Sequence, residues 1–569
     1  MNMFQETTRP RPANIIPVIF VSGSNYEMGY QYGYQMAESI KLIRDHQVGG
    51  LMRRLGNNIN AWYHLLKGFQ YYIKQYTPEI IDEMIGIALG TRDAGYEVSY
   101  ADILGINVAV CMKSASSPAA SLPSPLDELP PKEYREKYNL KATESVGAAQ
   151  AGESPPEGLK KMEDVAGACS RWAAWGSATK DGTLVCGDSI DGFYGYQVNI
   201  IAFPDIGNAF IAGVHRCGEL VLHPIMNNKG LWISGGNIDT PRDIDRNYGI
   251  PVTLALRHLG QFYENAEEAR KKLLSFQTTG GRVHNAMIAD TQGNAFIFEL
   301  TAVLKSYRKP GDFFEIDWIA SPNTYLIPEN CKLFAPELRP FQTDPRVAQL
   351  WAFFDKYKGK IDVEFGKMLY RYYDPVEDTY YIGNRFNQRV NVGLPKNRNG
   401  GIFYQSTGPA GRGVACGKSP QDHLDGTHTF YTLKLEANPR DVLQESEFTV
   451  ADCMGTADYA LRKLSLKMQD LPAFLVLKDM FSKATDEFYK GKHYLVDAQL
   501  ARRLEQTVLY GKALTSYVQA ESKFKQISHY IQPPAERPED LGLAPIEPPR
   551  PAMKVYQQMN IRQILEEGM

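Results

Sequence analysis

Apolar residues at helical spacing dominate the first 113 residues of the chain. An apolar run at 15–21 predicts one strand, and residues 25–46 predict a helix directly after it. Gly29 and Gly33 stand four positions apart on that helix, which indicates a face that another element approaches closely. We therefore expect residues 1–113 to form a strand followed by helices.

Capping residues mark two further helices in this N-terminal segment. Thr77 supplies an N-cap and Pro78 fits the first helical position, and apolar residues follow at helical spacing. Ser99 is the corresponding N-cap of a run that continues through Val110. These caps predict helices that begin directly after Thr77 and Ser99.

From 114 to 167 the periodic pattern disappears. Seven prolines, with scattered Ser, Ala and Gly, interrupt this stretch. Such a composition is typical of an exposed linker, and a long irregular loop inside a compact domain is uncommon unless it is functional or disordered. We expect a flexible linker over 114–168 that ends at the peptide bond between Ala168 and Cys169.

Beyond Cys169 the chain changes to short apolar runs separated by turn residues, which predict strands. The predicted strands cover 169–175, 184–187, 198–203, 209–214, 219–223, 230–234, 283–290 and 295–301. Asn265 caps a helix that runs to Phe276. Several strands are apolar along their whole length, which suits a sheet covered on both faces. The pattern favours an α+β fold whose core, 169–436, is an αββα sandwich.

After residue 323 the pattern is weaker. Further elements are predicted as helices at 345–357, 363–370 and 497–530 and as a strand at 427–436. A proline-rich tail at 532–551 predicts a strap over the surface. We assign residues 437–569 to a helical C-terminal extension.

Composition and charge exclude several classes of function. The chain of 569 residues has a formal net charge of −3 and a pI near 6.4, so it lacks the basic field that binds nucleic acid. No apolar stretch reaches the ~18 residues of a membrane span and no signal peptide is recognised, so we expect a cytoplasmic protein. The seven cysteines form no CxxC pair, and their odd number argues against a disulfide framework.

Cofactor and metal sites are not predicted. The Gly-Lys-Ser run at 417–419 lacks the leading glycine of a phosphate-binding loop, because Arg412 stands at that position. The aspartates between 239 and 245 lack the glycine and the closing Glu of a calcium loop. His215 and His223 have no third ligand nearby, so we interpret them as ordinary strand residues.

Cys169 is the strongest candidate for chemistry. It opens a Cys-Ser-Arg-Trp run directly behind the linker, which is the setting of a cysteine that becomes a chain terminus by self-cleavage. A freed α-amine has a pKa near ~7.7–8.0 and a thiol near ~8.5, so one residue would hold both a nucleophile and its base. The alternative is a cysteine that packs as a small apolar residue.

Two segments on either side of the linker resemble one enzyme family. Residues 23–33, GSNYEMGYQYG, and residues 181–191, DGTLVCGDSID, resemble signature segments of the acyltransferases that include fungal isopenicillin N acyltransferase, the peptidase C45 type. The second segment also resembles acid ceramidases and penicillin V acylases. The resemblance implies that Asp191 holds the α-amine of Cys169, whereas a surface β-turn is the alternative for this segment.

Three later segments resemble the same family in the same order. Residues 230–237, GLWISGGN, end on Asn237, whose amide the resemblance implies as an oxyanion donor; a plain Gly-Gly-Asn turn is the alternative. His284 opens a segment similar to the family's hairpin, and Asn323 is the next polar candidate. The candidate substrate contacts are Trp172, Asp188, Ser189, His284 and Asn285. At Asp188 and Ser189 the chain departs from relatives, which carry Arg or Gln and then Asn.

The resemblance spans 23–325 and implies a self-processing N-terminal nucleophile (Ntn) hydrolase. Cleavage before Cys169 would give chains 1–168 and 169–569, which stay partners, and Cys169 would hydrolyse a small linear amide or transfer its acyl group. A homo-oligomer is compatible with the chain. Two alternatives stay open: an esterase or lipid amidase similar to phospholipase B-like proteins, and a catalytically silent binding protein on the same scaffold, favoured by Asp188 and Ser189.

Overall fold

The computed structural model gives the arrangement of most of the chain. The described residues are 15–112, 169–191, 196–220, 222–238, 249–279, 283–302, 304–313, 315–334, 346–374, 379–380, 387–397, 400–406, 429–466 and 471–546. The predicted linker over 114–168, with Ala168, lies outside the described residues. So do the aspartates between 239 and 245 and the final part of the proline-rich tail.

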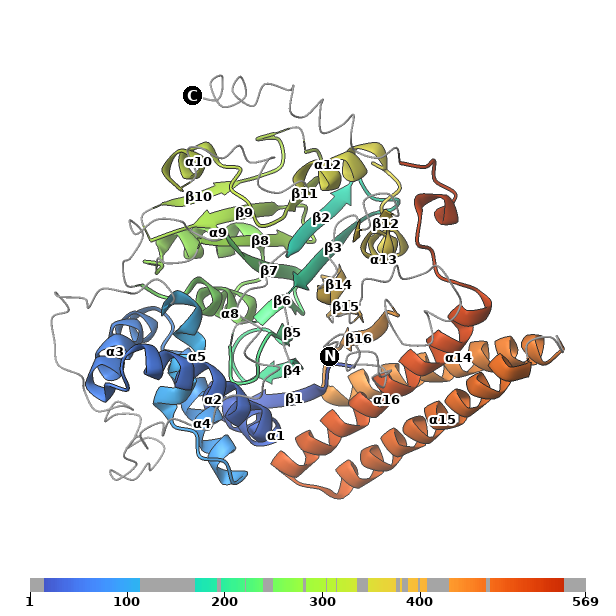
Figure 1. Ribbon diagram of the computed structural model, residues 1–569, viewed down its shortest axis with the longest axis horizontal. Coiled ribbons are helices and arrows are strands. Elements are labelled where there is room, and N and C mark those ends of the chain that lie inside the picture. The colour runs from blue at the N-terminus through green and yellow to red at the C-terminus, as the bar shows by residue number, and fades with distance from the viewer. Residues whose placement is uncertain are drawn as a thin grey trace, which may run out of the picture.

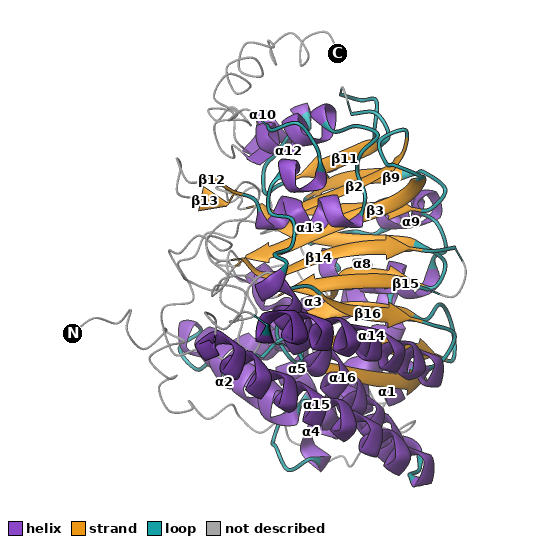
Figure 2. Ribbon diagram, turned by 90° about the vertical axis from the view of Figure 1, so that its right-hand side faces the viewer, coloured by secondary structure: helices purple, strands orange, loops and turns teal. Residues whose placement is uncertain are grey.

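Two sheets dominate the fold (Figures 1 and 2). The eight-stranded sheet has the order β1 (Val18–Gly23), β4 (Val198–Pro204), β5 (Phe210–Val214), β6 (Leu222–Asn227), β7 (Leu231–Ile238), β8 (Val283–Asp290), β9 (Ala295–Leu300) and β10 (Lys305–Arg308). The six-stranded sheet has the order β11 (Trp318–Ser321), β2 (Ser170–Gly176), β3 (Gly182–Asp191), β14 (Asn387–Pro395), β15 (Gly401–Ser406) and β16 (Tyr431–Leu435). A separate short pair joins β12 (Tyr373–Asp374) to β13 (Thr379–Tyr380).

The inner faces of the two sheets share one apolar core. Strand β4 shows the alternation that produces it: Ile201 joins Ala173 and Phe403 of the other sheet, whereas Ile200 and Ala202 face the opposite way. β1 pairs with β4 in parallel, and the other described ladder pairs are antiparallel. Central strands such as β5 and β9 are buried on both faces, which explains the continuous apolar runs of the sequence, whereas the edge strand β10 is partly exposed.

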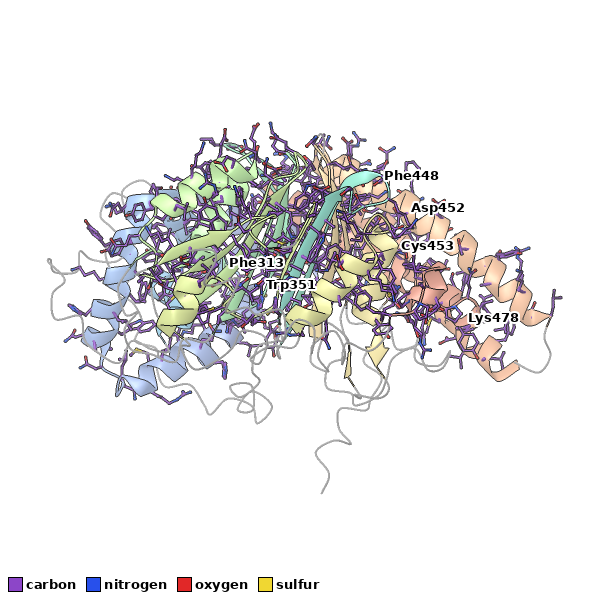
Figure 3. The ribbon with its side chains drawn as sticks, turned by 90° about the horizontal axis from the view of Figure 1, so that it is seen from above. Phe313, Trp351, Phe448, Asp452, Cys453 and Lys478 are labelled. Atoms are coloured by element: carbon purple, nitrogen blue, oxygen red, sulfur yellow. The ribbon has the colours of Figure 1, made fainter. Side chains whose placement is uncertain are left out.

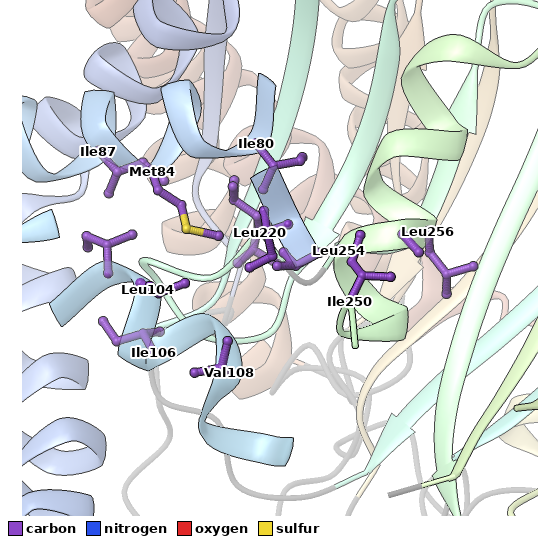
Figure 4. Packing of buried hydrophobic residues seen from close by; sticks show 14 of the residues in the cluster. Ile80, Met84, Ile87, Leu104, Ile106, Val108, Leu220, Ile250, Leu254 and Leu256 are labelled. Atoms are coloured by element: carbon purple, nitrogen blue, oxygen red, sulfur yellow. The ribbon is translucent and has the colours of Figure 1, made fainter. Parts of the chain in front are cut away.

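Helices cover the outer face of the eight-stranded sheet. They are α1 (Asn25–Gln35), α2 (Ala37–Arg54), α3 (Ile59–Tyr76), α4 (Pro78–Asp93), α5 (Tyr100–Met112), α8 (Val252–Phe262) and α9 (Ala266–Ser275). Figure 4 shows part of their common core, where Met84 of α4 and Leu104 of α5 lie near Leu220 and Leu254. This cluster joins residues before and after the predicted linker into one packed unit.

A smaller helical layer covers the outer face of the six-stranded sheet. It contains α12 (Arg346–Lys356) and α13 (Val363–Arg371), and α10 (Pro328–Phe334) follows β11. Trp351 of α12 contacts Phe313 with ring centroids 5.9 Å apart, and Figure 3 shows the two side chains together. The described part of the tail, 532–546, crosses these helices as the predicted strap, since the hydroxyl of Tyr357 donates to the carbonyl of Ala544 at 2.7 Å.

Three long helices follow β16. They are α14 (Pro439–Ser465), α15 (Leu471–Leu500) and α16 (Arg503–Ile531), and they extend to one side of the molecule (Figures 1 and 3). Their buried residues belong to the same core cluster as the inner faces of the sheets. The hydroxyl of Thr515 on α16 accepts from the backbone N–H of Val18 at 3.1 Å. Within the described ranges, no helix combines the length and apolar character needed to cross a membrane.

The glycine pattern at the N-terminus predicted a close approach, and α4 provides it. A Cβ atom added to Gly29 would lie 2.0 Å from the carbonyl oxygen of Glu83, and one added to Gly33 would lie 2.1 Å from that of Ile87. Gly86 on α4 is equally close to the backbone of α1, at 2.2 Å from the Tyr26 oxygen. The helix backbones therefore touch, and only glycine fits at this crossing.

Several predicted boundaries are wrong. The helix predicted over 25–46 is two helices, broken at Met36, and the helix predicted from 497 begins at Arg503 after the end of α15. Thr77 does precede α4, but its hydroxyl donates back to the carbonyl of Ile73 at 3.2 Å and makes no side-chain cap. By contrast, Ser99 caps α5, since its hydroxyl accepts from the N–H of Asp102 at 3.1 Å.

Candidate active site

Cys169 lies at one end of the six-stranded sheet. It directly precedes β2, and the antiparallel neighbour β3 ends beside it at Asp191. Strand β11 ends at the same end of the sheet, because its last residue, Ser321, pairs with Arg171 near the start of β2. Asn323 follows two residues later. The strand order thus brings segments from three parts of the sequence around Cys169.

The eight-stranded sheet contributes the end of β7 and the start of β8. Asn237 and His284 are cross-strand partners there, one residue beyond Gly236. A Cβ atom added to Gly236 would lie 1.7 Å from Nη2 of Arg171, so the two sheets are in contact at this point. For Asp191, Asn237 and His284 the structure describes the backbone position only. Their predicted roles stay predictions.

A continuous polar row crosses the six-stranded sheet next to Cys169. In strand order from β11 to β16 it consists of Ser321, Arg171, Asp188, Asn391, Gln405 and Tyr431. All six residues are buried, with at most 2 % of their surface exposed. Cross-strand partners in a sheet share a face, so this row lies between the two sheets and interrupts their apolar core.

Hydrogen bonds connect the far half of this row. Nε2 of Gln405 donates to Oδ1 of Asn391 at 2.8 Å, and the Tyr431 hydroxyl donates to Oε1 of Gln405. Asn199 of the other sheet exchanges two hydrogen bonds with Gln405, at 2.8 and 3.1 Å. Most buried polar atoms of this half are thus hydrogen-bonded to one another, as is usual for buried polar groups, and they form a structural network.

Arg171 occupies the half of the row nearest Cys169. Its Nη1 donates to the carbonyl of Asn285 at 2.9 Å and also to Oδ1 of the same residue. The Asn285 amide in turn donates to the Ser321 hydroxyl at 2.9 Å. Arg171 is wholly buried, and burial lowers the pKa of its guanidinium, whereas the nearby Cys169 and Asp188 raise it. One side chain therefore joins β2, β8 and the end of β11.

Asp188 lies between two guanidinium groups. Burial raises its pKa to about 7, although Arg171, Arg389 and the Asn391 amide each favour the ionised form. Neither carboxylate oxygen has a hydrogen-bond partner of good geometry among the described residues, so these groups act on Asp188 through their charge and dipole. A carboxylate thus stands at the position where the resembling family carries Arg or Gln, and Arg171 faces it from β2.

Ser189 supports the backbone beside Cys169. Its hydroxyl accepts from the N–H of Ser170 at 3.0 Å, across the β2–β3 pair. Ser189 and Asp188 are fully buried, and so is Asn285, which makes protein contacts on the site side of β8. Their prediction as substrate contacts stays a prediction, and what the structure shows is their support of the Cys169 strand.

Arg346 connects Cys169 to Asn323. From the first turn of α12, its Nη1 donates to the carbonyl of Cys169 at 3.1 Å and to the Ser170 hydroxyl at 3.2 Å. Its Nη2 donates to Oδ1 of Asn323 at 3.2 Å. A bidentate guanidinium of this kind fixes the relative position of the groups it joins. Asn323, a predicted site residue, is therefore held beside Cys169.

Trp172 is not brought to this group. It packs against Phe354 with ring centroids 5.2 Å apart, and Gly187 and Gly366 accommodate its indole. These contacts lie in the core under α12 and α13, on the face of β2 opposite Arg171. The structure thus separates Trp172 from the other described candidates.

Glu299 holds the segment behind Asn323. This buried residue of β9 accepts from the backbone N–H of Leu326 at 2.6 Å and from that of Ile327 at 3.2 Å. The Asn330 amide donates to its other oxygen at 3.2 Å. Burial raises the pKa of Glu299 to about 7 in spite of these hydrogen bonds, which favour the charged form.

Sequence reasoning missed Arg171 and Arg346 as site residues. Arg171 had a local signal, because it lies two positions after the candidate nucleophile and a buried arginine needs partners. Arg346 had none, since it reaches Cys169 only through the packing of α12 against β11 and is 177 residues away in the sequence. Long-range contacts of this kind leave no periodic or spacing pattern.

No family model matches the chain. A relative from Archaeoglobus fulgidus, described only as an uncharacterized protein, is 22% identical over 403 residues, which cover 64% of this chain. The chain spans 59% of that relative's length.

Three solved structures are similar to parts of the chain. Two are variants of conjugated bile acid hydrolase from Clostridium perfringens, 16% and 15% identical, with TM-scores of 0.27 and 0.28. They match 42% and 48% of this chain and 89% and 97% of their own. The third is penicillin V acylase from Agrobacterium tumefaciens, 12% identical with a TM-score of 0.27, matching 42% of this chain and 83% of that one. The function proposed below rests on the residues around Cys169.

Proposed function

We propose that the protein is a cysteine Ntn hydrolase, built as an αββα sandwich, that cleaves its own chain before Cys169 and then hydrolyses a linear amide bond. The observation that carries the proposal is the placement of Cys169. It directly precedes β2 at the end of the six-stranded sheet, directly after the predicted cleavage bond. Arg346 joins its carbonyl to Asn323, and Arg171 lies two positions further along the chain. A cysteine that only packs as a small apolar residue needs no guanidinium groups beside it.

Self-cleavage requires no group beyond the chain and water. The Cys169 thiol attacks the carbonyl carbon of Ala168, the C–N bond breaks, and the acyl group passes to sulfur as the proton passes to the new amine. Water then hydrolyses the thioester, which leaves a carboxylate on Ala168 and restores the thiol. The product is a chain that begins with a cysteine whose α-amine is free to act as a base.

Substrate hydrolysis repeats the same chemistry on an external amide. The α-amine of Cys169 takes the thiol proton, the thiolate attacks the acyl carbon, and the amine then protonates the leaving nitrogen as the C–N bond breaks. Water then hydrolyses the thioester, which releases the carboxylic acid and restores the thiol. Asn237 is assigned as the oxyanion donor, and Asp191 as the carboxylate that orients the amine. Arg346 supports this assignment, because it fixes the Cys169 carbonyl and keeps the backbone around the nucleophile rigid.

N-terminal sequencing of the purified protein tests the first half of the proposal. We expect a chain that begins Cys-Ser-Arg-Trp beside the original N-terminus. The Cys169→Ala variant is expected to remain one species near 63.9 kDa and to lack amidase activity. Cys453→Ala is the matched control, since Cys453 lies on α14, away from both sheet ends, and should be cleaved and active like the parent.

Release of amine from a panel of N-acyl amino acids tests the second half, with the corresponding p-nitrophenyl esters assayed in parallel. We expect turnover of amides that depends on Cys169. An uncleaved protein that hydrolyses amides, or a Cys169→Ala variant with full activity, would show that the assignment is wrong. Turnover of the esters alone would favour the esterase alternative.

A further inference from the structure

Arg171 is an unusual residue for the interior of a sheet sandwich. Its side chain leaves β2, crosses to the eight-stranded sheet and lies against the backbone of Gly236. Only Nη1 is hydrogen-bonded, to Asn285, while Nε and Nη2 are buried without a hydrogen-bond partner among the described residues. The hydrogen-bond partner of this guanidinium is neutral, so its positive charge acts on the ionisable groups nearby.

Cys169 lies two positions before Arg171 along the same extended segment, so their side chains leave one face, and Asp188 on β3 is the cross-strand partner of Arg171. Among the described residues, Cys169, Asp188, Arg346 on α12 and Tyr370 on α13 act electrostatically on the guanidinium. Cys169 and Asp188 are the two groups in this set whose ionised forms interact most with Arg171, and Arg346 opposes it with a like charge. The positive charge of Arg171 therefore attracts two anions, the Cys169 thiolate and the Asp188 carboxylate.

We propose that Arg171 is a positioning residue of the Cys169 site, whose guanidinium stabilises the Cys169 thiolate, and that Asp188 limits this stabilisation. The proposal rests on the proposed function, because it takes Cys169 as the nucleophile. The same side chain fixes the geometry of the site, since it ties β2 to Asn285 and, through the Asn285 amide, to Ser321 at the end of β11. Charge and position thus come from one residue.

Arg389 provides a matched control. It is also a wholly buried arginine of the six-stranded sheet, it also faces Asp188, and it also lies against a glycine of the other sheet, with Nη1 2.5 Å from a Cβ atom added to Gly213. Its Nη1 donates to the carbonyl of Val214 at 3.2 Å. Arg389 lies on β14, which β3 separates from β2 in the sheet, so removal of Arg389 changes the core but leaves the guanidinium of Arg171 in place.

The test is the pH dependence of alkylation of Cys169 by iodoacetamide, followed by mass spectrometry of the peptide that contains Cys169. A nearby opposite charge lowers the pKa of an acid by about one unit or more, so Arg171→Met should slow alkylation at pH 7 about tenfold. Asp188→Asn should accelerate it, because a negative charge near the thiolate is lost. Arg389→Met should leave the apparent pKa of the thiol within a few tenths of a unit.

The apparent pKa from the full pH profile is compared, not the rate at one pH, because structural damage exposes a buried thiol and accelerates its alkylation. Damage of this kind does not shift the apparent pKa in opposite directions in the two variants. Arg171→Lys, which keeps the charge, should retain an apparent pKa below that of Arg171→Met. An unchanged apparent pKa in Arg171→Met, or a raised one in Asp188→Asn, overturns the proposal. If Arg171→Met does not fold, the nearly isosteric Asp188→Asn variant is the test. The proposal is overturned if the apparent pKa of the Cys169 thiol does not fall in that variant.

Activity distinguishes this failure from failure of the proposed function. If the fully alkylated protein still hydrolyses its amide substrate, Cys169 is not the nucleophile and the proposed function is wrong. If alkylation abolishes activity but substitution of Arg171 and Asp188 leaves the apparent pKa of the Cys169 thiol unchanged, the proposed function stands and this inference is wrong.

Discussion

Buried carboxylates near the candidate site carry raised pKa values because the interior disfavours their charge. Glu299 and Asp188 show the two ways a protein handles this cost. Glu299 accepts three backbone or amide N–H groups, so its charge is stabilised by hydrogen bonds and it positions the segment after Asn323. The ionised form of Asp188 is favoured chiefly by the charges of Arg171 and Arg389, with a smaller contribution from the Asn391 amide.

Glu299 should make the stability of the protein fall as pH rises. Its pKa is about 7 in the folded protein and ~4.3 in an unfolded chain, so the folded state holds a proton that the unfolded state has released. The contribution is fully present below about pH 4.3 and is lost as pH rises to about 7, at about 1.4 kcal/mol per pH unit. Urea unfolding of Glu299→Gln should lack this component.

The comparison is best made in the Cys169→Ala background, so that every variant is a single chain. Glu267→Gln is the control, because the hydrogen bond from Arg270 lowers the pKa of this partly exposed residue and its small effect has the opposite sign. Parallel stability curves for Glu299→Gln and its parent between pH 4.5 and 7.5 would contradict the prediction.

At the scale of elements, the crossing of α1 and α4 depends on glycine. The Cβ atom of Gly29→Ala would meet a backbone oxygen at 2.0 Å, and backbone of a neighbouring helix cannot move away cheaply. We expect Gly29→Ala to lower the free energy of unfolding by about 1–3 kcal/mol, the usual cost of overpacking. Thermal or urea unfolding in the Cys169→Ala background measures it.

Gly49 on α2 is the matched control for this crossing. Among the described residues, a Cβ atom there would meet the end of the Arg53 side chain at 3.5 Å and nothing closer. Because alanine is the better helix former, Gly49→Ala should stabilise the protein by up to about 1 kcal/mol. Equal effects of the two substitutions would mean that the helices are not in backbone contact.

Elements with an apolar period were predictable and those that bury polar residues were not. The runs at β8 and β9 matched their strands closely, whereas β14 and β15 were missed because the buried polar residues Arg389, Asn391 and Gln405 interrupt the continuous apolar run of a strand covered on both faces. The break between α15 and α16 was missed since Ala501 and Arg502 carry no helix-breaking signal. For the site, the sequence predicted Cys169 before a strand, but it did not predict Arg171 and Arg346 as its neighbours because their contacts arise from tertiary packing.

At the scale of the whole molecule, the segments before and after the predicted cleavage bond form one structure. β1 lies in the eight-stranded sheet with six residues paired to β4. Residues before the predicted cleavage bond hydrogen-bond to the 218–220 turn, which follows it. Tyr32 accepts from the N–H of Gly218 at 2.7 Å, and Asn107 accepts from that of Leu220 at 2.6 Å. α16 adds hydrogen bonds between Thr515 and Val18.

Cleavage before Cys169 should therefore leave a complex that does not separate. The two chains share the large apolar core under α1–α5 as well as a sheet, and an interface of this kind resembles the interior of a single domain. We expect residues 1–168, carrying an N-terminal tag, to retain 169–569 on an affinity column in 1 M salt, and both to elute together in size exclusion until denaturant is added. A protease site placed in 114–168 produces comparable pieces without self-cleavage, so the prediction can be checked whichever way the chain is cut. Loss of 169–569 in the flow-through under native conditions would show that the first segment is a dispensable appendage rather than part of the core.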